Sequence, residues 1–188
     1  MLPLGTAAPD YALREVTTGK TVKLADIAQK KALLVMFICN HCPYVKHVED
    51  GLTAFARDYA TRDVAIVAIS ANDAETHPDD APEKLAGTAK ARGWKFPYLY
   101  DQAQSVAKSY TAACTPDFFL FDAQRRLVYR GQFDSSRPNT AIRVTGADLR
   151  AALDALLAGK PVAKEQKPSL GCNIKWRAGN EPAYFGGR

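Results

Sequence analysis

Cysteine spacing gives the clearest chemical signal in this 188-residue sequence, because Cys39 and Cys42 lie three positions apart. Two thiols at this spacing can form an intramolecular disulfide or supply two ligands to a metal ion. In the first case the thiolate of one cysteine attacks a partner disulfide, and the second thiol then resolves the mixed disulfide. A closed zinc site takes four ligands, and the sequence has no second Cys-x-x-Cys or paired-histidine segment to complete one. The spacing therefore favours redox chemistry without a metal or an organic cofactor.

The segment around these cysteines lies between a predicted strand and a predicted helix. Residues 31–39 are nearly all apolar over the length of a strand, which indicates a strand buried on both faces of a sheet. Beyond Cys42, apolar residues recur at spacings of mostly three and four as far as Tyr59, which is typical of an amphipathic helix. We therefore expect Cys39 at the exposed N-terminus of this helix, where free N–H groups and the helix dipole favour a thiolate. Cys39 is then the attacking thiol, and the more buried Cys42 is the resolving thiol.

His41 lies between the two cysteines, and two roles for its side chain are open. A protonated imidazole beside the Cys39 thiolate would stabilise the reduced form and make the dithiol more oxidising. Alternatively, the ring points into solvent and takes no part in the chemistry.

The rest of the sequence alternates between strand and helix patterns and predicts a single α/β domain with a mainly parallel sheet. A second apolar run at 64–70 completes a strand, helix, strand unit, whose parallel strands need a helical crossover. Asp80, Pro82 and Glu83 are the N-cap, first-turn proline and capping-box acid expected where a helix to residue 92 begins. The domain spans residues 1–160, and the polar residues 161–188 form an irregular tail packed on or near it. The further predicted elements are a hairpin over 11–22, a strand over 96–100, a short helix over 105–110, a hairpin over 118–133 and a helix over 145–159.

Composition argues against several classes of protein. The formal net charge is +5, but the lysines and arginines are scattered among 20 acidic residues, so nucleic-acid binding is not expected. No apolar run approaches the roughly 18 residues that would span a membrane. The first residues have neither the basic region nor the apolar run of a signal peptide, so we expect a cytoplasmic protein. Its cysteines would stay reduced there rather than staple the fold.

Cys114 and Cys172 are candidates for a third redox thiol. Cys114 lies two residues before Pro116, which could bring it near the dithiol, although free cysteines commonly fill the core. Cys172 lies in the polar tail and is expected to be exposed and reactive. It either folds back to pair with an active-site cysteine or has no role.

Two segments, Cys39-Asn40-His41-Cys42 and Cys114-Thr115-Pro116, make the sequence similar to the thioredoxin superfamily. Within it, the chain resembles the peroxiredoxin-like branch of alkyl hydroperoxide reductases and thiol-specific antioxidant proteins over nearly its whole length. The resemblance implies a thioredoxin-like three-layer sandwich with a central mixed β-sheet and an N-terminal hairpin. It also implies that Cys39 is the nucleophile, Cys42 the resolving thiol and Pro116 a cis-proline.

The same resemblance suggests how a substrate binds. The loop before Pro116 would face the dithiol and offer the free backbone groups of Thr115 to a substrate strand. Tyr44 would form part of an apolar wall for the partner.

The sequence departs from the family at two places. Peroxiredoxins have a P-x-x-x-T-x-x-C pattern before the peroxidatic cysteine, whereas Val35 and Cys39 take the Pro and Thr places before Cys42. Thioredoxins have a buried acid in the strand before the first cysteine, and the matching residue here is Leu33. We therefore expect thiol-disulfide exchange with a disulfide-containing protein or a small-molecule thiol substrate, supported by a thioredoxin- or glutathione-type electron donor. A peroxiredoxin-like thiol peroxidase with an antioxidant role and a metal-binding or copper-delivery module are the alternatives.

Overall fold

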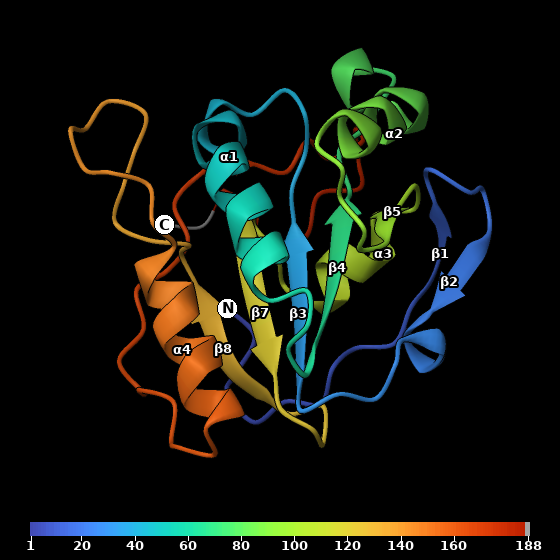
Figure 1. Cartoon of the computed structure of the whole chain (residues 1–188). Coiled ribbons are helices and arrows are strands. Elements are labelled where there is room, and N and C mark those ends of the chain that lie inside the picture. The colour runs from blue at the N-terminus through green and yellow to red at the C-terminus, as the bar shows by residue number, and fades with distance from the viewer. Residues whose placement is uncertain (187–188) are drawn as a thin grey trace.

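A seven-stranded mixed sheet is the middle layer of the computed structural model, which describes residues 1–186 (Figure 1). The strand order is β2-β1-β5-β4-β3-β7-β8, with β3, β4 and β5 parallel to one another and the other pairs antiparallel. This is the predicted α/β fold with a thioredoxin-like mixed sheet. The strands are β1 (Ala12–Glu15), β2 (Thr21–Lys23), β3 (Ala32–Phe37), β4 (Val64–Ser70), β5 (Tyr98–Tyr100), β7 (Asp117–Phe121) and β8 (Leu127–Gly131).

Helices cover both faces of this sheet. In Figure 1, α1 and α4 lie in front of the strands and α3 lies behind them. The helix α2 contributes its apolar side chains to the same core as α1 and α4. The helices are α1 (Pro43–Asp58), α2 (Pro82–Ala91), α3 (Ser105–Ser109) and α4 (Ala147–Leu157), with short 3-10 turns η1 (Leu24–Asp26) and η2 (Pro78–Asp80).

The central strand β3 explains why residues 31–39 are apolar without alternation. All six of its residues are buried, because β4 and β7 flank it and helices cover both of its faces. Leu34 and Met36 face the core under α1, whereas Val35 and Phe37 face the core that contains α3. Burial of each such side chain contributes about 1.5–3 kcal/mol, so β3 holds the segment that follows it in a fixed place.

The start of α2 differs from the prediction. Its N-cap is Ala81 with no side-chain cap, and Asp80 belongs to the preceding turn η2. The Asp80 carboxylate faces the segment after β3 instead of the helix that follows it. The spacing of Asp80 and Pro82 is typical of a helix start, but the Asp80 side chain forms tertiary hydrogen bonds with Asn40 and His41 instead of capping the helix.

The tail runs back along the domain and crosses the top of the sheet in Figure 1, where the red segment passes the ends of β3 and β4. Its residues Ile174 and Trp176 are 1% and 9% exposed and belong to the core behind the sheet. Earlier in the tail, the Lys167 carbonyl accepts a hydrogen bond from the Gln132 N–H. A Cβ at Gly131 would lie 2.2 Å from that carbonyl oxygen. The tail also forms the strand β9 (Cys172–Asn173), which pairs with β6 (Cys114–Thr115).

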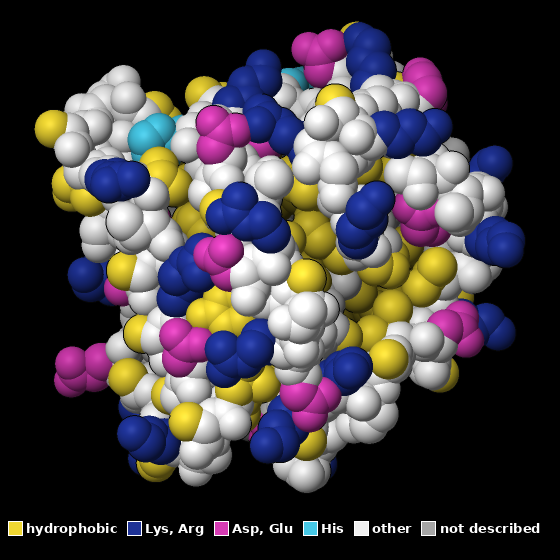
Figure 2. Space-filling view, viewed as in Figure 1, with side chains coloured by type: hydrophobic (Ala, Val, Ile, Leu, Met, Phe, Trp, Pro, Cys, Tyr) yellow, Lys and Arg dark blue, Asp and Glu magenta, His cyan; other side chains and the backbone are white. Residues whose placement is uncertain are grey.

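One part of the front face has no helix over it. A hollow of about 650 Å³ is lined there by apolar residues that include Tyr59, Ile66, Trp94 and Phe96. Figure 2 shows hydrophobic side chains gathered at the surface on this side of the molecule. Within residues 1–186, no helix is both long and apolar enough to cross a membrane.

Candidate active site

The two cysteines lie at the junction between β3 and α1, but Cys42 rather than Cys39 is at the helix. Cys42 is the N-cap of α1, which begins at Pro43. Cys39 lies in the loop after β3 and is 2% exposed, so the expectation that it occupies the exposed helix N-terminus is wrong. Pro43 explains the difference, because proline is suited to the first position of a helix and fixes the start there. The helix dipole therefore acts more directly on Cys42.

Asp80 holds the loop between the two cysteines from one side. Its side chain is fully buried, and its two oxygens accept four hydrogen bonds. Oδ1 accepts the backbone N–H groups of Asn40 at 2.6 Å and His41 at 3.1 Å. Oδ2 accepts hydrogen bonds from Asn72 Nδ2 at 2.8 Å and His41 Nδ1 at 2.6 Å. A buried carboxylate satisfied in this way fixes the shape of the loop, because breaking one partner leaves buried groups unpaired.

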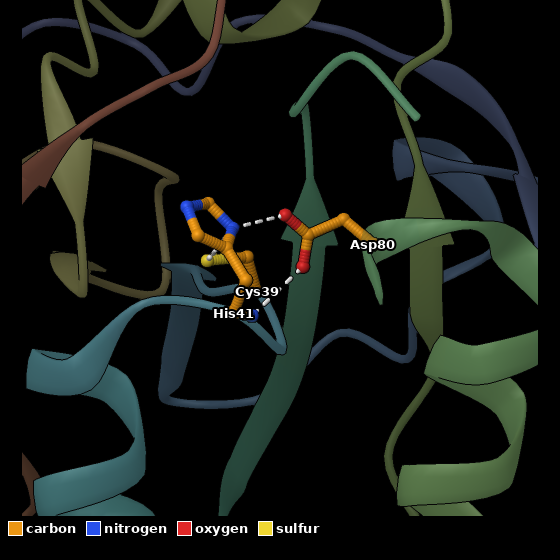
Figure 3. Close-up of side chains that lie close together, drawn as sticks. All are labelled: Cys39, His41 and Asp80. Carbon is orange, nitrogen blue, oxygen red and sulfur yellow. Dashed lines mark hydrogen bonds and ion pairs between the residues drawn. The ribbon is translucent and has the colours of Figure 1, made fainter. Parts of the chain in front are cut away.

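His41 is directed at this carboxylate and not into solvent (Figure 3). Its Nδ1 lies 2.6 Å from Asp80 Oδ2 but 3.9 Å from Cys39 Sγ, so the Nδ1 hydrogen belongs to the contact with Asp80. The ring is therefore held beside Cys39 by Asp80. The expected effect of His41 on the thiolate is opposed, because the pKa of Cys39 is raised, first by the hydrogen bond with Cys42 and by burial and then by the negative charge of Asp80.

The ionisation of each thiol depends on the other. The hydrogen bond with Cys39 is the largest cause that lowers the pKa of Cys42 to about 4, and the same bond raises the pKa of Cys39. One proton is thus lost easily and one is retained. The retained proton can lie on either sulfur. When it lies on Cys42, this thiol donates to the Thr115 carbonyl at 3.1 Å, and the negative charge is on Cys39. Thr115 Oγ1 lies 3.3 Å from Cys39 Sγ and can donate to that charge.

The opposite side of the pair is formed by the Thr115–Pro116 loop. The peptide bond between these residues is cis, as predicted. Both functional groups of Thr115 contact the dithiol, its hydroxyl at Cys39 and its carbonyl at Cys42. The prediction that the Thr115 backbone is free for a substrate strand is wrong, because β6 is already paired with β9 of the tail. This pairing could not be predicted, since the tail has no strand periodicity.

The remaining candidate residues lie around the same loop. Cys114 is buried, and burial raises the pKa of its thiol. Cys172 is partly exposed and lies opposite Thr115 across the two-stranded pair. All four cysteines are free thiols. Tyr44 lines a shallow depression that also includes Pro116 and Leu170.

Asp80 is the site residue that sequence reasoning missed. A signal for it was present, because β3 and β4 are parallel and the carboxyl ends of parallel strands lie at the same edge of a sheet. The polar segment after β4, Asn72 to Asp80, therefore had to lie beside the segment after β3. The loop between the cysteines also exposes backbone N–H groups that need an acceptor once buried.

The same cluster has the composition of a metal site. The ligand atoms of Cys39, His41 and Asp80 lie within 4.8 Å of one another. The hydrogen bonds to both Asp80 oxygens, however, occupy the positions from which a carboxylate would coordinate an ion. The arrangement is that of a hydrogen-bonded network.

Comparison with solved structures places two bacterial proteins close to this chain. An uncharacterized conserved protein from Geobacillus kaustophilus is 55% identical, with a TM-score of 0.92 and coverage of 94% of each chain. A hypothetical protein from Sinorhizobium meliloti 1021 is 53% identical, also with a TM-score of 0.92, over 95% of this chain and 97% of the other. The peroxidoxin BcpB from Mycobacterium tuberculosis is 19% identical with a TM-score of 0.59, over 84% of this chain and 96% of the other, which supports the fold alone. No curated protein matches the chain.

Family models give the assignment that these structures leave open. The model of the AhpC/TSA family matches residues 4–130, which contain β1 to β7, the dithiol and the Thr115–Pro116 loop. This agrees with the resemblance in the two cysteine-containing segments. The chain is a member of the AhpC/TSA family with a thioredoxin-like fold.

Proposed function

We propose that this protein is a thiol-disulfide oxidoreductase whose Cys39–Cys42 dithiol exchanges disulfides with a partner. The observation that carries the proposal is the pair of free thiols between β3 and α1, in which the interaction with Cys39 lowers the pKa of Cys42 to about 4. A pair in this state supplies a thiolate and a neighbouring thiol at neutral pH, and both are needed for exchange.

The reaction follows from the two placements of the retained proton. With the proton on Cys42, the Cys39 thiolate attacks one sulfur of the partner disulfide, and the other partner sulfur leaves as a thiolate that takes up a proton. Cys42 then attacks Cys39 Sγ, the mixed disulfide breaks, and the partner is released with two thiols. The protein ends with a Cys39–Cys42 disulfide, having given two electrons. Thr115 Oγ1, 3.3 Å from Cys39, is placed to stabilise the attacking thiolate.

The partner proposed is a disulfide-containing protein or small molecule, and a thioredoxin- or glutathione-type thiol returns the enzyme to its reduced form. Tyr44, Pro116 and Leu170 offer an apolar surface next to the dithiol for the partner. We also propose a cytoplasmic location, where reduced thiols persist.

Insulin reduction with dithiothreitol as the final reductant tests this proposal. The wild-type protein should accelerate the reaction, and Cys39→Ser should abolish the acceleration. Cys42→Ser should release partner slowly, so full turnover by this variant would contradict the resolving role. Cys114→Ala is the matched control, because Cys114 is a buried thiol for which the reaction above has no role.

A thiol peroxidase is the second candidate, and the burial of the dithiol favours it. Cys39 is 2% exposed, so a small hydroperoxide reaches it more easily than a folded protein does. In that reaction the Cys39 thiolate attacks one oxygen of the hydroperoxide, the O–O bond breaks, and the other oxygen takes up a proton and leaves as an alcohol or water. The thiol of Cys42 then attacks the sulfenic acid at Cys39 and forms the disulfide with loss of water. Peroxide consumption by the reduced protein, measured beside the insulin assay, separates the two. Fast consumption that Cys39→Ser abolishes would favour the peroxidase.

A further inference from the structure

The tail strand β9 brings Cys172 to the dithiol. In the β6–β9 pair, Thr115 lies directly opposite Cys172. Directly opposed residues of an antiparallel pair project their side chains to the same face. Because the Thr115 side chain contacts Cys39, Cys172 projects to the dithiol face as well. Cys114 is the neighbour of Thr115 in β6 and therefore projects to the opposite face.

The position of Cys172 is fixed by its neighbours in the tail. A Cβ at Gly171 would lie 2.0 Å from the Thr115 carbonyl oxygen, so only glycine allows the tail this close to the loop. Ser169 Oγ lies 2.6 Å from both Asp117 Oδ1 and the Gly131 carbonyl on one side of Cys172. On the other side, Ile174 N–H donates to the Ala113 carbonyl, and its side chain is buried. Anchors on both sides hold Cys172 at a defined place rather than in a free tail.

Cys172 contacts Cys42 and not only the loop. Cys172 packs against the core cluster that contains Cys39 and Cys42, and its thiol lies near enough to Cys42 for that thiol to raise its pKa. The three sulfurs differ in access, because Cys39 and Cys42 are 2% and 0% exposed, whereas Cys172 is partly exposed. Cys172 is thus the thiol through which a reagent in solution can reach the pair.

We propose that Cys172 is a third redox thiol. It replaces Cys39 as the disulfide partner of Cys42 and receives electrons from the external reductant. The proposal rests on the proposed exchange at Cys39 and Cys42. In the oxidised protein, the Cys172 thiolate attacks Cys42 Sγ, the Cys39–Cys42 bond breaks, and a Cys42–Cys172 disulfide forms. Cys39 leaves as a thiolate, and the proton lost by Cys172 balances its charge. This step moves the disulfide without a net gain or loss of electrons.

The second half of the cycle reduces the new disulfide at the surface. A small dithiol or glutathione-type thiol attacks Cys172 Sγ, and Cys42 leaves as a thiolate. A second reductant thiol then attacks the mixed disulfide at its own sulfur and releases Cys172 as a thiol. The substrate disulfide is thus reduced at Cys39, and the two electrons enter at Cys172.

The electrostatics of Cys172 agree with this order of steps. In the reduced protein its pKa is raised to about 11, first by burial and then by the hydrogen bond and charge of Cys42. The causes that involve Cys42 disappear once Cys42 forms a disulfide with Cys39. Cys172 is therefore held as a thiol in the reduced protein and is more easily ionised in the oxidised one.

Disulfide mapping of the full-length protein tests the proposal, because trypsin places the cysteines on distinguishable peptides. Cys39 and Cys42 share the peptide 32–46, whereas Cys172 is on the peptide 165–175. Reduced protein is oxidised with diamide, free thiols are alkylated, and the monomer band of a non-reducing gel is digested for mass spectrometry. The wild type should give peptide 32–46 linked to 165–175 with Cys39 alkylated. Cys39→Ser should give the same link, and Cys172→Ser should give only the loop within 32–46.

Two controls keep the outcomes separate. Cys114→Ala should map as the wild type does, since Cys114 projects to the other face. If the wild type forms the loop within 32–46, but neither it nor folded Cys39→Ser forms the link to 165–175, the role of Cys172 is overturned and the exchange at Cys39 and Cys42 stands. If neither disulfide forms and insulin reduction is absent, both proposals are wrong.

In steady-state assays with glutathione, Cys172→Ser should lose turnover while a single turnover of substrate by the reduced enzyme is unchanged.

Discussion

The dithiol is held between two walls that are built in opposite ways. The wall on the Asp80 side is a buried carboxylate with four hydrogen bonds, and Tyr98 adds a hydrogen bond from its hydroxyl to the Ile38 carbonyl. The wall on the other side is the two-residue strand β9, which is only partly buried and belongs to an irregular tail. The first cannot open without leaving buried polar groups unpaired, whereas β9 is a partly exposed strand of two residues that can detach between the anchors at Ser169 and Ile174. The difference indicates that the loop geometry is permanent and that access to the thiols is controlled from the tail side.

Removal of the Asp80 carboxylate should have the largest effect. In Asp80→Ala, the N–H groups of Asn40 and His41 lose their buried acceptor, and we expect a loss of about 2–4 kcal/mol in the free energy of unfolding. Urea denaturation of the reduced protein measures this loss. Asp79→Ala is the matched control, because the Asp79 side chain is exposed and pairs with Lys84 at the surface. Equal stability of the two variants would contradict the claim that the hydrogen bonds of Asp80 hold the loop between the cysteines in place.

Substitution of Gly171 should open the tail wall and leave the domain folded. In Gly171→Ala, the new Cβ meets the Thr115 carbonyl at 2.0 Å, and such overpacking costs about 1–3 kcal/mol. The population with β9 detached should then rise about fivefold to more than a hundredfold. Iodoacetamide labelling of Cys39 and Cys42, followed by mass spectrometry, should accelerate accordingly. Gly87→Ala, where a Cβ meets nothing within 4 Å, should label at the wild-type rate, and an unchanged rate in Gly171→Ala would show that β9 does not cover the thiols.

His41 should have a smaller effect, on the reduction potential. Without the ring, the Asp80 charge near Cys39 loses one hydrogen-bond partner, and this charge raises the pKa of Cys39. The thiolate form of the reduced protein is then less stable, so His41→Ala should be less oxidising by about 30 mV, the equivalent of ~1.4 kcal/mol. Equilibration with glutathione buffers measures the shift. His47→Ala is the control, since His47 contacts Ser136 and not the dithiol, and a higher potential in His41→Ala would contradict this role.

The last expected effect is a pH dependence of the tail wall. The Ser169 hydroxyl ties the tail to Asp117, because it lies 2.6 Å from both Asp117 Oδ1 and the Gly131 carbonyl and can donate its one hydrogen to either oxygen. Burial raises the pKa of Asp117 to about 7, so its contribution to the stability of the folded chain is present in acid and is lost as the pH rises through 7. Urea unfolding of the reduced protein between pH 5 and 8 should show this fall. Asp117→Asn keeps a donor and cannot titrate, so a slope that persists in this variant would exclude Asp117 as its origin.

The two walls also differ in how well the sequence predicted them. The elements that carry the dithiol follow from periodicity, because β3 is uniformly apolar and α1 has an apolar stripe. Asp80 was assigned to a helix cap because the sequence shows its local neighbours and not the partners that lie 40 residues away. The position of the tail was harder still to predict from the sequence. Residues 161–186 have no strand pattern, and the pairing of Cys172 with Thr115 depends on the missing Cβ of Gly171 and on anchors elsewhere in the tail.

Thiolate titration by ultraviolet absorbance tests the central claim most directly, namely that Cys39 and Cys42 share one proton at neutral pH. The reduced wild type should carry one thiolate at pH 7, with a midpoint near the pKa of about 4. Cys39→Ser and Cys42→Ser should each lose it, because the hydrogen bond between the thiols is the main cause of the low value, and Cys114→Ala should retain it. If the wild type shows no thiolate below the usual cysteine range near pH 8.5, the pair is not ionised and the account is wrong.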